Sequence, residues 1–82
     1  MNVEAVLAVA AALGLPPRAA YPARTAARIL GIGRSSVYEA IHAGRIAVVR
    51  VGRVLYIPVY ELARVLAEGG LQGENPRAGT RG

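Results

Sequence analysis

Arginine supplies every permanently positive side chain of this 82-residue chain, whose ten arginines and five glutamates give a formal net charge of +5. Eight of the arginines lie between residues 18 and 64 together with only Glu39 and Glu61, so this segment alone carries a charge of +6. A planar guanidinium donates two parallel hydrogen bonds to the oxygens of one phosphate. The clustering therefore indicates a phosphate-bearing partner such as a nucleic acid, with a solvated basic surface as the alternative that charge alone leaves open.

The sequence lacks the residue types that most enzymes and metal sites require. It contains no cysteine, which excludes disulfides, thiolate metal ligands and cysteine nucleophiles. His42 is the only histidine, so a zinc ion would have too few ligands, and we expect this side chain to be exposed at a helix end. Ser35 and Ser36 have no nearby base, so we expect them to help a helix start bind phosphate. We therefore expect no enzymatic activity, no cofactor and no metal ion.

Glycines and prolines divide the chain into short segments with helical or strand-like spacing of apolar residues. Asn2 can cap the first helix, while Gly31 and Gly44 can end the second and third. Two runs rich in β-branched residues flank Gly52 and Arg53, which predicts a β-hairpin. The predicted elements are helices at 3–13, 22 or 23 to 30, 34–43 and 59–67, and strands at 46–51 and 54–57.

The first predicted helix is rich in alanine and has two open roles: packing on the rest of the domain, or contact with a second copy of the chain. The apolar run at residues 3–15 is too short to cross a bilayer, which takes about 20 residues. Glu4 stands where a secretory signal would carry a positive charge. We therefore expect a cytoplasmic protein with no membrane partner.

Residues 22–43 have the pattern of a helix-turn-helix, in which two short helices are joined by a turn containing glycine. Gly31 suits the turn, and Ile32 is expected to be buried between the two helices. The second helix would place Val37 inward and a polar face outward, in the position that enters the major groove of DNA. Tyr56 and Tyr60 are expected to be half-buried by packing.

Residues 21–66 resemble the excisionase-type helix-turn-helix domain, a relative of the MerR-type winged domain. The resemblance rests on an A-x-x-L-G-I-x-R-S-S-V-Y run at residues 27–38, on Gly44-Arg45, on the V-x-V-G-R turn at 49–53 and on Ile57-Pro58 followed by Leu62. It implies that 34–43 is the recognition helix and that the turn at 50–53 is a wing. The residues it assigns to DNA are Arg34, Ser35, Ser36 and Tyr38 on the helix, and Arg50 and Arg53 on the wing.

Other positions add to this interface or depart from the family pattern. Arg24 and Arg28 lie on the helix that crosses the DNA backbone in this geometry, where they contact phosphate or merely keep the face soluble. Glu39 replaces a residue that is often basic, and it either reads a cytosine amino group or is a solvated acid. Pro22 replaces the usual Ser or Thr cap, and the second strand is less basic than usual.

We accordingly predict a mainly α fold with a small β-hairpin, a winged helix-turn-helix. The predicted organisation is an N-terminal helix and proline-rich linker at 1–18, the DNA-binding domain at 19–68 and a flexible tail at 69–82. The predicted partner is double-stranded DNA. The functions left open are an excisionase-like factor acting with a site-specific recombinase, an operator-binding regulator acting with RNA polymerase, and a protein-interaction module. Because one small domain touches few bases, we expect a homodimer or a cooperative oligomer on DNA.

Overall fold

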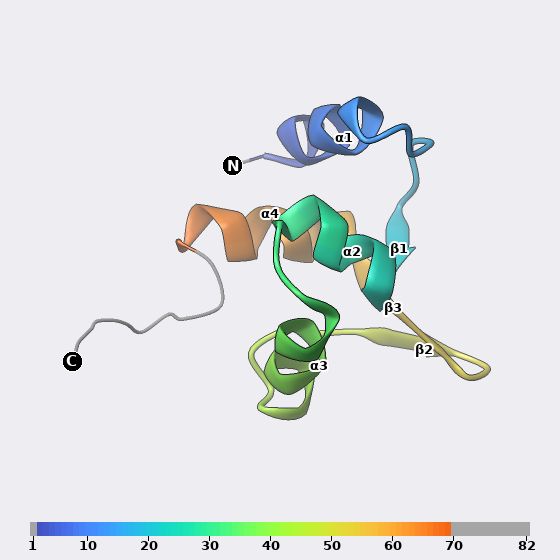
Figure 1. Cartoon of the computed structure of the whole chain (residues 1–82), viewed down its shortest axis with the longest axis vertical. Helices are drawn as coiled ribbons and strands as arrows, with labels where there is room; N and C mark the ends of the chain where they lie inside the picture. Colours follow the sequence, from blue (N-terminus) through green and yellow to red (C-terminus); the bar gives the residue numbers. More distant parts are fainter. Residues whose placement is uncertain (1, 70–82) are drawn as a thin grey trace.

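The computed structural model describes residues 2–69, which form helices and one three-stranded antiparallel sheet. The elements are α1 (Val3–Ala12), β1 (Ala20–Pro22), α2 (Ala23–Leu30), α3 (Arg34–His42), β2 (Val49–Val51), β3 (Val54–Pro58) and α4 (Val59–Ala67) (Figure 1). The predicted fold class is therefore confirmed, and each predicted helix is found within about a residue of its expected bounds. The predicted tail at 69–82 lies outside the described residues apart from Gly69.

The core is formed where α1, the sheet and α4 meet. In Figure 1, α1 lies on one side of α2 and α4, and α3 lies on the other side together with the hairpin of β2 and β3. The largest fully buried side chains come from five different elements: Val6, Tyr21, Val37, Ile57 and Leu62. Val6 and Ala10 of α1 are fully buried in this core, so the packing role expected for the first helix is confirmed.

Strand β1 was not predicted. It lies in the linker after α1 and pairs with the edge of β3 that faces away from β2. Tyr21 pairs with Ile57 in an antiparallel register and is only 1% exposed. Its hydroxyl donates a hydrogen bond to the carbonyl oxygen of Pro16 at 2.7 Å, and the N–H of Val59 donates to the carbonyl oxygen of Ala19 at 2.9 Å. These bonds fix the linker against the start of α4. The three strands lie in the order β1-β3-β2, so β3 is the central strand and β1 and β2 are the two edges.

The turn between α2 and α3 takes the shape that its glycine allows. Gly31 has φ of +75°, a left-handed conformation that costs glycine little, and its N–H donates to the carbonyl oxygen of Ala27 at 2.8 Å. The N–H of Ile32 donates to the same oxygen at 3.1 Å. The prediction that Ile32 is buried is wrong in degree, since its side chain is only partly buried. Ala26 and Ala27 are so small that the helices approach closely without needing a full plug between them.

Candidate nucleic-acid interface

Helix α3 presents a polar face to solvent because its apolar residues pack towards α2. Val37 and Ala40 are buried, and Ile41 is partly buried. Gly33 precedes the helix and offers no side-chain cap to its first N–H groups. The residues predicted to face outward are all exposed: Arg34, Ser35, Ser36, Tyr38, Glu39 and His42.

Strands β2 and β3, with the two-residue turn between them, form a wing that projects away from the helices (Figure 1). Arg50 lies in β2 opposite Leu55. Gly52 has φ of +62°, which lets the chain reverse in two residues and leaves Arg53 in the turn. Both arginines are exposed. The wing is shorter than predicted, because residues 46–48 are not in the strand and Ile46 is buried beside it.

The first helix of the motif adds two more cations to the same region. Arg24 and Arg28 are exposed, whereas Ala23, Ala26 and Ala27 on the other side of α2 are buried. Arg28 also reaches back to the end of α1, where its guanidinium donates to the carbonyl oxygen of Leu13 at 3.4 Å.

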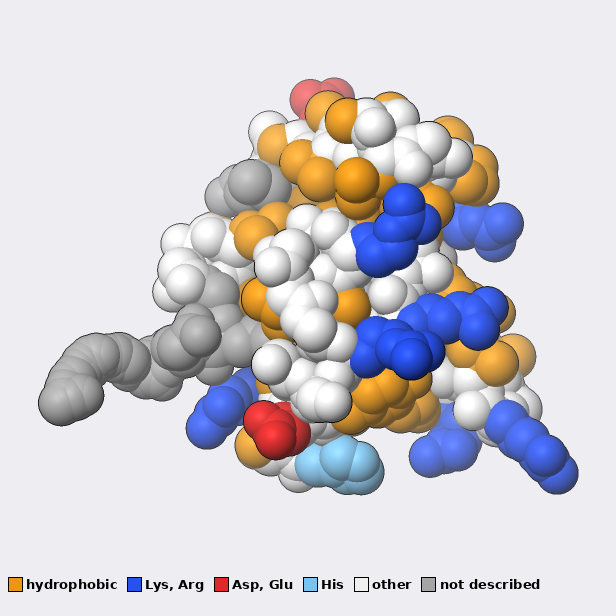
Figure 2. Space-filling view, in the orientation of Figure 1, with side chains coloured by type: hydrophobic (Ala, Val, Ile, Leu, Met, Phe, Trp, Pro, Cys, Tyr) orange, Lys and Arg blue, Asp and Glu red, His pale blue; other side chains and the backbone are white. Residues whose placement is uncertain are grey.

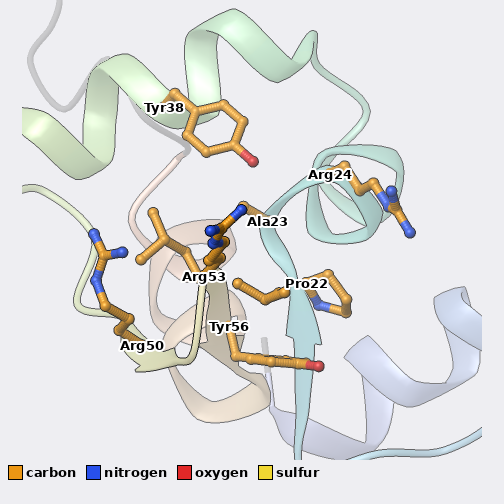
Figure 3. Close-up of a pocket in the computed structure, with 9 residues that line it drawn as sticks. Pro22, Ala23, Arg24, Tyr38, Arg50, Arg53 and Tyr56 are labelled. Carbon is orange, nitrogen blue, oxygen red and sulfur yellow. The ribbon is translucent and has the colours of Figure 1, made fainter.

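A hollow of about 340 Å³ lies where these three elements converge (Figure 3). Its lining includes Arg24 of α2, Tyr38 of α3, and Arg50 and Arg53 of the wing. Figure 3 shows the Tyr38 hydroxyl directed down towards the wing and the two wing guanidiniums rising towards α3, while Arg24 extends outward from the start of α2. Tyr56 of β3 also lines this hollow and is partly buried, as predicted.

A second, more open hollow of about 500 Å³ continues this surface around the turn of the motif. It is lined by Arg24 and Arg28 of α2, by Arg34 of α3, and by Ile32 and Gly33 between the helices. Arg24 lines both hollows and therefore joins them. In Figure 2 most of the basic side chains on the visible face lie over its right-hand half, where α2 and the wing lie.

Six of the nine predicted site residues are thus brought to one continuous surface, which we call the basic face: Arg24, Arg28, Arg34, Tyr38, Arg50 and Arg53. Ser35, Ser36 and Glu39 are exposed on α3 but line neither hollow. Among residues 2–69, none of the arginines of the basic face is in an ion pair, because both salt bridges belong to Arg64. The free guanidiniums leave this surface strongly positive.

Arg64 is one of the eight arginines counted in the basic segment, and the structure gives it a different role. It forms ion pairs with Glu61 at 2.6 Å and with Glu68 at 2.8 Å. Its guanidinium also donates to the carbonyl oxygen of Arg45 at 2.7 Å. Glu61 is only 6% exposed. Its structural role was missed because it was counted only as one negative charge of the segment. Glu61 and Arg64 are three residues apart on one helix, and this spacing is the signal that could have predicted their ion pair.

This pairing shifts the pKa of both groups. The hydrogen bond from Arg64 lowers the pKa of Glu61, and the N–H of Ala47 and the charge of Arg64 add to this effect, which outweighs the rise that burial alone would cause. The same hydrogen bond to Glu61 raises the pKa of Arg64. The pair is therefore a stable carboxylate and guanidinium at neutral pH.

Comparison with known protein families agrees with this geometry. The family model described as helix-turn-helix domain matches residues 23–70, more than half of the chain. The chain belongs to the helix-turn-helix domain family. The expected resemblance to the excisionase-type domain is confirmed, and the matched helix-turn-helix region contains α2, α3, the wing and α4. The family implies DNA binding. No curated protein and no solved structure matches the chain.

Two further features concern other kinds of site. Across residues 2–69, no cluster of three or more histidine, cysteine, aspartate or glutamate residues is arranged to hold a metal ion. Within that same range, every helix is too short or too polar to cross a membrane.

Proposed function

We propose that this protein binds double-stranded DNA sequence-specifically through the basic face, as an excisionase-like factor that directs a site-specific recombinase. The observation that carries the proposal is the convergence of the α3 face, the wing and α2 on two joined hollows lined by unpaired arginines. The helix-turn-helix family supports the DNA partner, and the excisionase-type motif at residues 27–38 supports the recombination role.

In this proposal, α3 enters the major groove, which is wide enough to admit a helix. Arg34 at its start reads a base edge, because a guanidinium can donate two hydrogen bonds to one guanine. Ser35, Ser36 and Glu39 on the same helix are the remaining contacts to bases or to the neighbouring phosphates. Glu39 would accept a hydrogen bond from a cytosine amino group, which is the pairing typical of a carboxylate in the major groove.

The wing contacts the adjacent part of the duplex, with Arg50 and Arg53 on phosphates or in the minor groove. When a helix and a wing occupy neighbouring grooves, the sugar-phosphate strand that separates the grooves must pass between them. The hollow between α3 and the wing is at that position, and its lining of Tyr38 and three arginines suits the oxygens of a phosphodiester. Arg24 and Arg28 then neutralise the next phosphates along the strand.

The first experiment selects bound duplexes from a random pool. We expect an enriched motif, and we expect the preference at one of its base pairs to relax when Arg34 is replaced by alanine. A pool that stays random, with no binding at low salt, would show that the basic face is merely a solvated surface and would favour a protein-interaction module.

A second experiment tests the recombination role by mapping the enriched motif in the source genome. An excisionase-like factor predicts repeated copies of the motif beside the attachment sites of a recombinase. Copies placed instead within promoters would contradict that role and assign the protein to operator binding.

A further inference from the structure

Glu61 is a buried carboxylate in a small domain, and its contacts lead away from its own helix. It lies in the first turn of α4 and is only 6% exposed. One of its oxygens accepts hydrogen bonds from the N–H of Ala47 at 2.9 Å and from Arg64 at 2.6 Å, and the other accepts from Arg64 at 3.1 Å. All of these hydrogen bonds therefore come from two partners: Ala47 in the loop before β2 and Arg64 in the next turn of α4.

The loop that Glu61 holds is the connection between the recognition helix and the wing. Arg64 binds the carbonyl oxygen of Arg45, and Glu61 binds the N–H of Ala47, so the two side chains hold the backbone on both sides of Ile46. The side chain of Ile46 is itself only 3% exposed. β2 begins two residues after Ala47, while the other end of the wing, β3, continues directly into α4. Both ends of the wing are thus fixed to α4, one by the chain and the other by this pair.

Stability alone is a poor explanation for this arrangement. Burying the carboxylate of Glu61 costs desolvation free energy, and a well-packed apolar residue in its place often stabilises a fold as much or more. An apolar side chain at position 61 would, however, leave the Ala47 N–H without its acceptor and would not hold the loop in one orientation. The directional bonds define where the wing begins relative to the end of α3.

We propose that Glu61, oriented by Arg64, is a positioning residue for DNA binding that sets the angle of the wing relative to α3. Neither side chain belongs to the basic face. They affect DNA binding by positioning Arg50 and Arg53 of the wing. This inference rests on the proposed function, since it assumes that the wing contacts DNA. It predicts that loosening the pair weakens the contacts of the wing and leaves those of α3 intact.

The test compares Glu61→Gln and Arg64→Gln with the wild-type chain on a short mixed-sequence duplex. We expect affinity to fall by about 3- to 30-fold, the range typical of coupled positions that do not touch the ligand. We also expect the slope of log affinity against log salt to become shallower by about one unit for each lost phosphate contact. A loss that comes only from unfolding would leave this slope unchanged.

The matched control is Glu68→Gln. Glu68 contacts the same arginine from the exposed side, with 59% of its side chain accessible, and has no bond to the loop. We expect this variant to keep wild-type affinity and slope. Arg64 is itself 41% exposed, so Arg64→Gln tests the proposal even if Glu61→Gln fails to give the circular dichroism spectrum of the folded protein.

Double variants identify the route of the effect. Arg64→Gln should add almost nothing to the loss already caused by Arg50→Ala with Arg53→Ala, and should add fully to the loss caused by Arg34→Ala. Full additivity with the wing variants, or a wild-type salt slope in both glutamine variants, would overturn the positioning role. If the wild-type chain binds no duplex at all, the proposed function fails instead, so the two failures are distinguishable.

Discussion

At the scale of single residues, the arginines of the chain divide by their partners. Arg64 has two carboxylates and a carbonyl oxygen within hydrogen-bond distance, so its charge is used inside the protein. Those of the basic face have no carboxylate partner among residues 2–69. The charge of a guanidinium without a carboxylate partner is not compensated within the protein, and it is therefore available to an anion that approaches from outside.

Arg34 is the residue at which base-specific contact is best tested. It stands at the first position of α3, exposed, and lines the hollow that leads towards α2. Arg34→Ala should cost about 1–3 kcal/mol of binding free energy to the preferred site and relax preference at one base pair, because a bidentate contact is lost. Competition titrations with duplexes altered at each position measure both effects. An equal loss on every sequence would assign Arg34 to phosphate instead.

Glu61 gives the fold a defined response to acid. Its pKa is lowered in the folded protein from an ordinary value of 4.5, chiefly by the hydrogen bond from Arg64. A lowered pKa means that its contribution to stability is fully present above 4.5 and is lost as the pH falls through the folded value. Denaturant titrations at several pH values should therefore show stability declining below pH 4.5, with a smaller decline in Glu61→Gln. Parallel curves for the two proteins would contradict this assignment.

At the scale of elements, the wing is the part whose contribution should be independent of sequence. Arg53 lies in its two-residue turn, where a flexible cation meets phosphate more readily than it reads a defined base edge. Arg53→Ala should weaken binding to all duplexes alike and make the salt slope shallower by about one unit. The measurement is affinity at several salt concentrations on the enriched motif and on a scrambled duplex. A loss confined to the enriched motif would indicate base readout by the wing.

The turn between α2 and α3 is tested by comparing two isoleucines. Ile32 is partly buried in the turn, whereas Ile57 is fully buried in β3. Ile57→Ala should cost about 2–5 kcal/mol of unfolding free energy, since it leaves a cavity. Ile32→Ala removes less buried surface and should cost about 1–2 kcal/mol. Chemical denaturation measures both, and an equal cost would mean that the turn residue is packed as tightly as the core.

The sequence predicts the elements that carry their own local signals and fails where the signal lies elsewhere in the chain. The four helices have glycine stops and apolar stripes, the first also has its Asn2 cap, and the hairpin has its glycine turn. Strand β1 has none of these, because three residues ending in Pro22 form a strand only when β3 is beside them. Tyr60 was expected to be half-buried but is 65% exposed, since the stripe of α4 that faces the core passes through Leu62 and Val65.

The candidate site shows the same division. The outward face of α3 and the wing arginines follow from helical spacing and from the turn, so they could be predicted. Their shared hollow could not, because it depends on the tertiary packing that places the wing beside Tyr38. The contact from Glu61 to the Ala47 N–H spans 14 residues and ends on a backbone group that any residue type would supply. Nothing in the sequence marks such a partner.

At the scale of the whole molecule, size limits what one copy can recognise. Residues 2–69 extend 38 Å along their longest axis, close to the length of one turn of duplex DNA, about 34–36 Å. A module of this kind buries about 600–1,000 Å² on DNA, at the low end of specific interfaces. The accessible surface of the chain is 4730 Å², so most of it remains free in a complex with one copy. Neighbouring copies on DNA therefore have ample surface through which to contact each other.

Binding by several copies should accordingly be tighter than binding by one. We expect a duplex with two adjacent copies of the enriched motif to be occupied at lower protein concentration than a duplex with one, because contact between neighbours adds to the free energy of DNA binding. Sedimentation velocity with the two duplexes measures both stoichiometry and affinity. A third duplex, with the motifs moved half a helical turn apart, is the control: it keeps both sites, places them on opposite sides of the DNA and should bind each copy independently. Equal affinity on all three duplexes, with one tightly bound copy per motif, would show that a single basic face is sufficient.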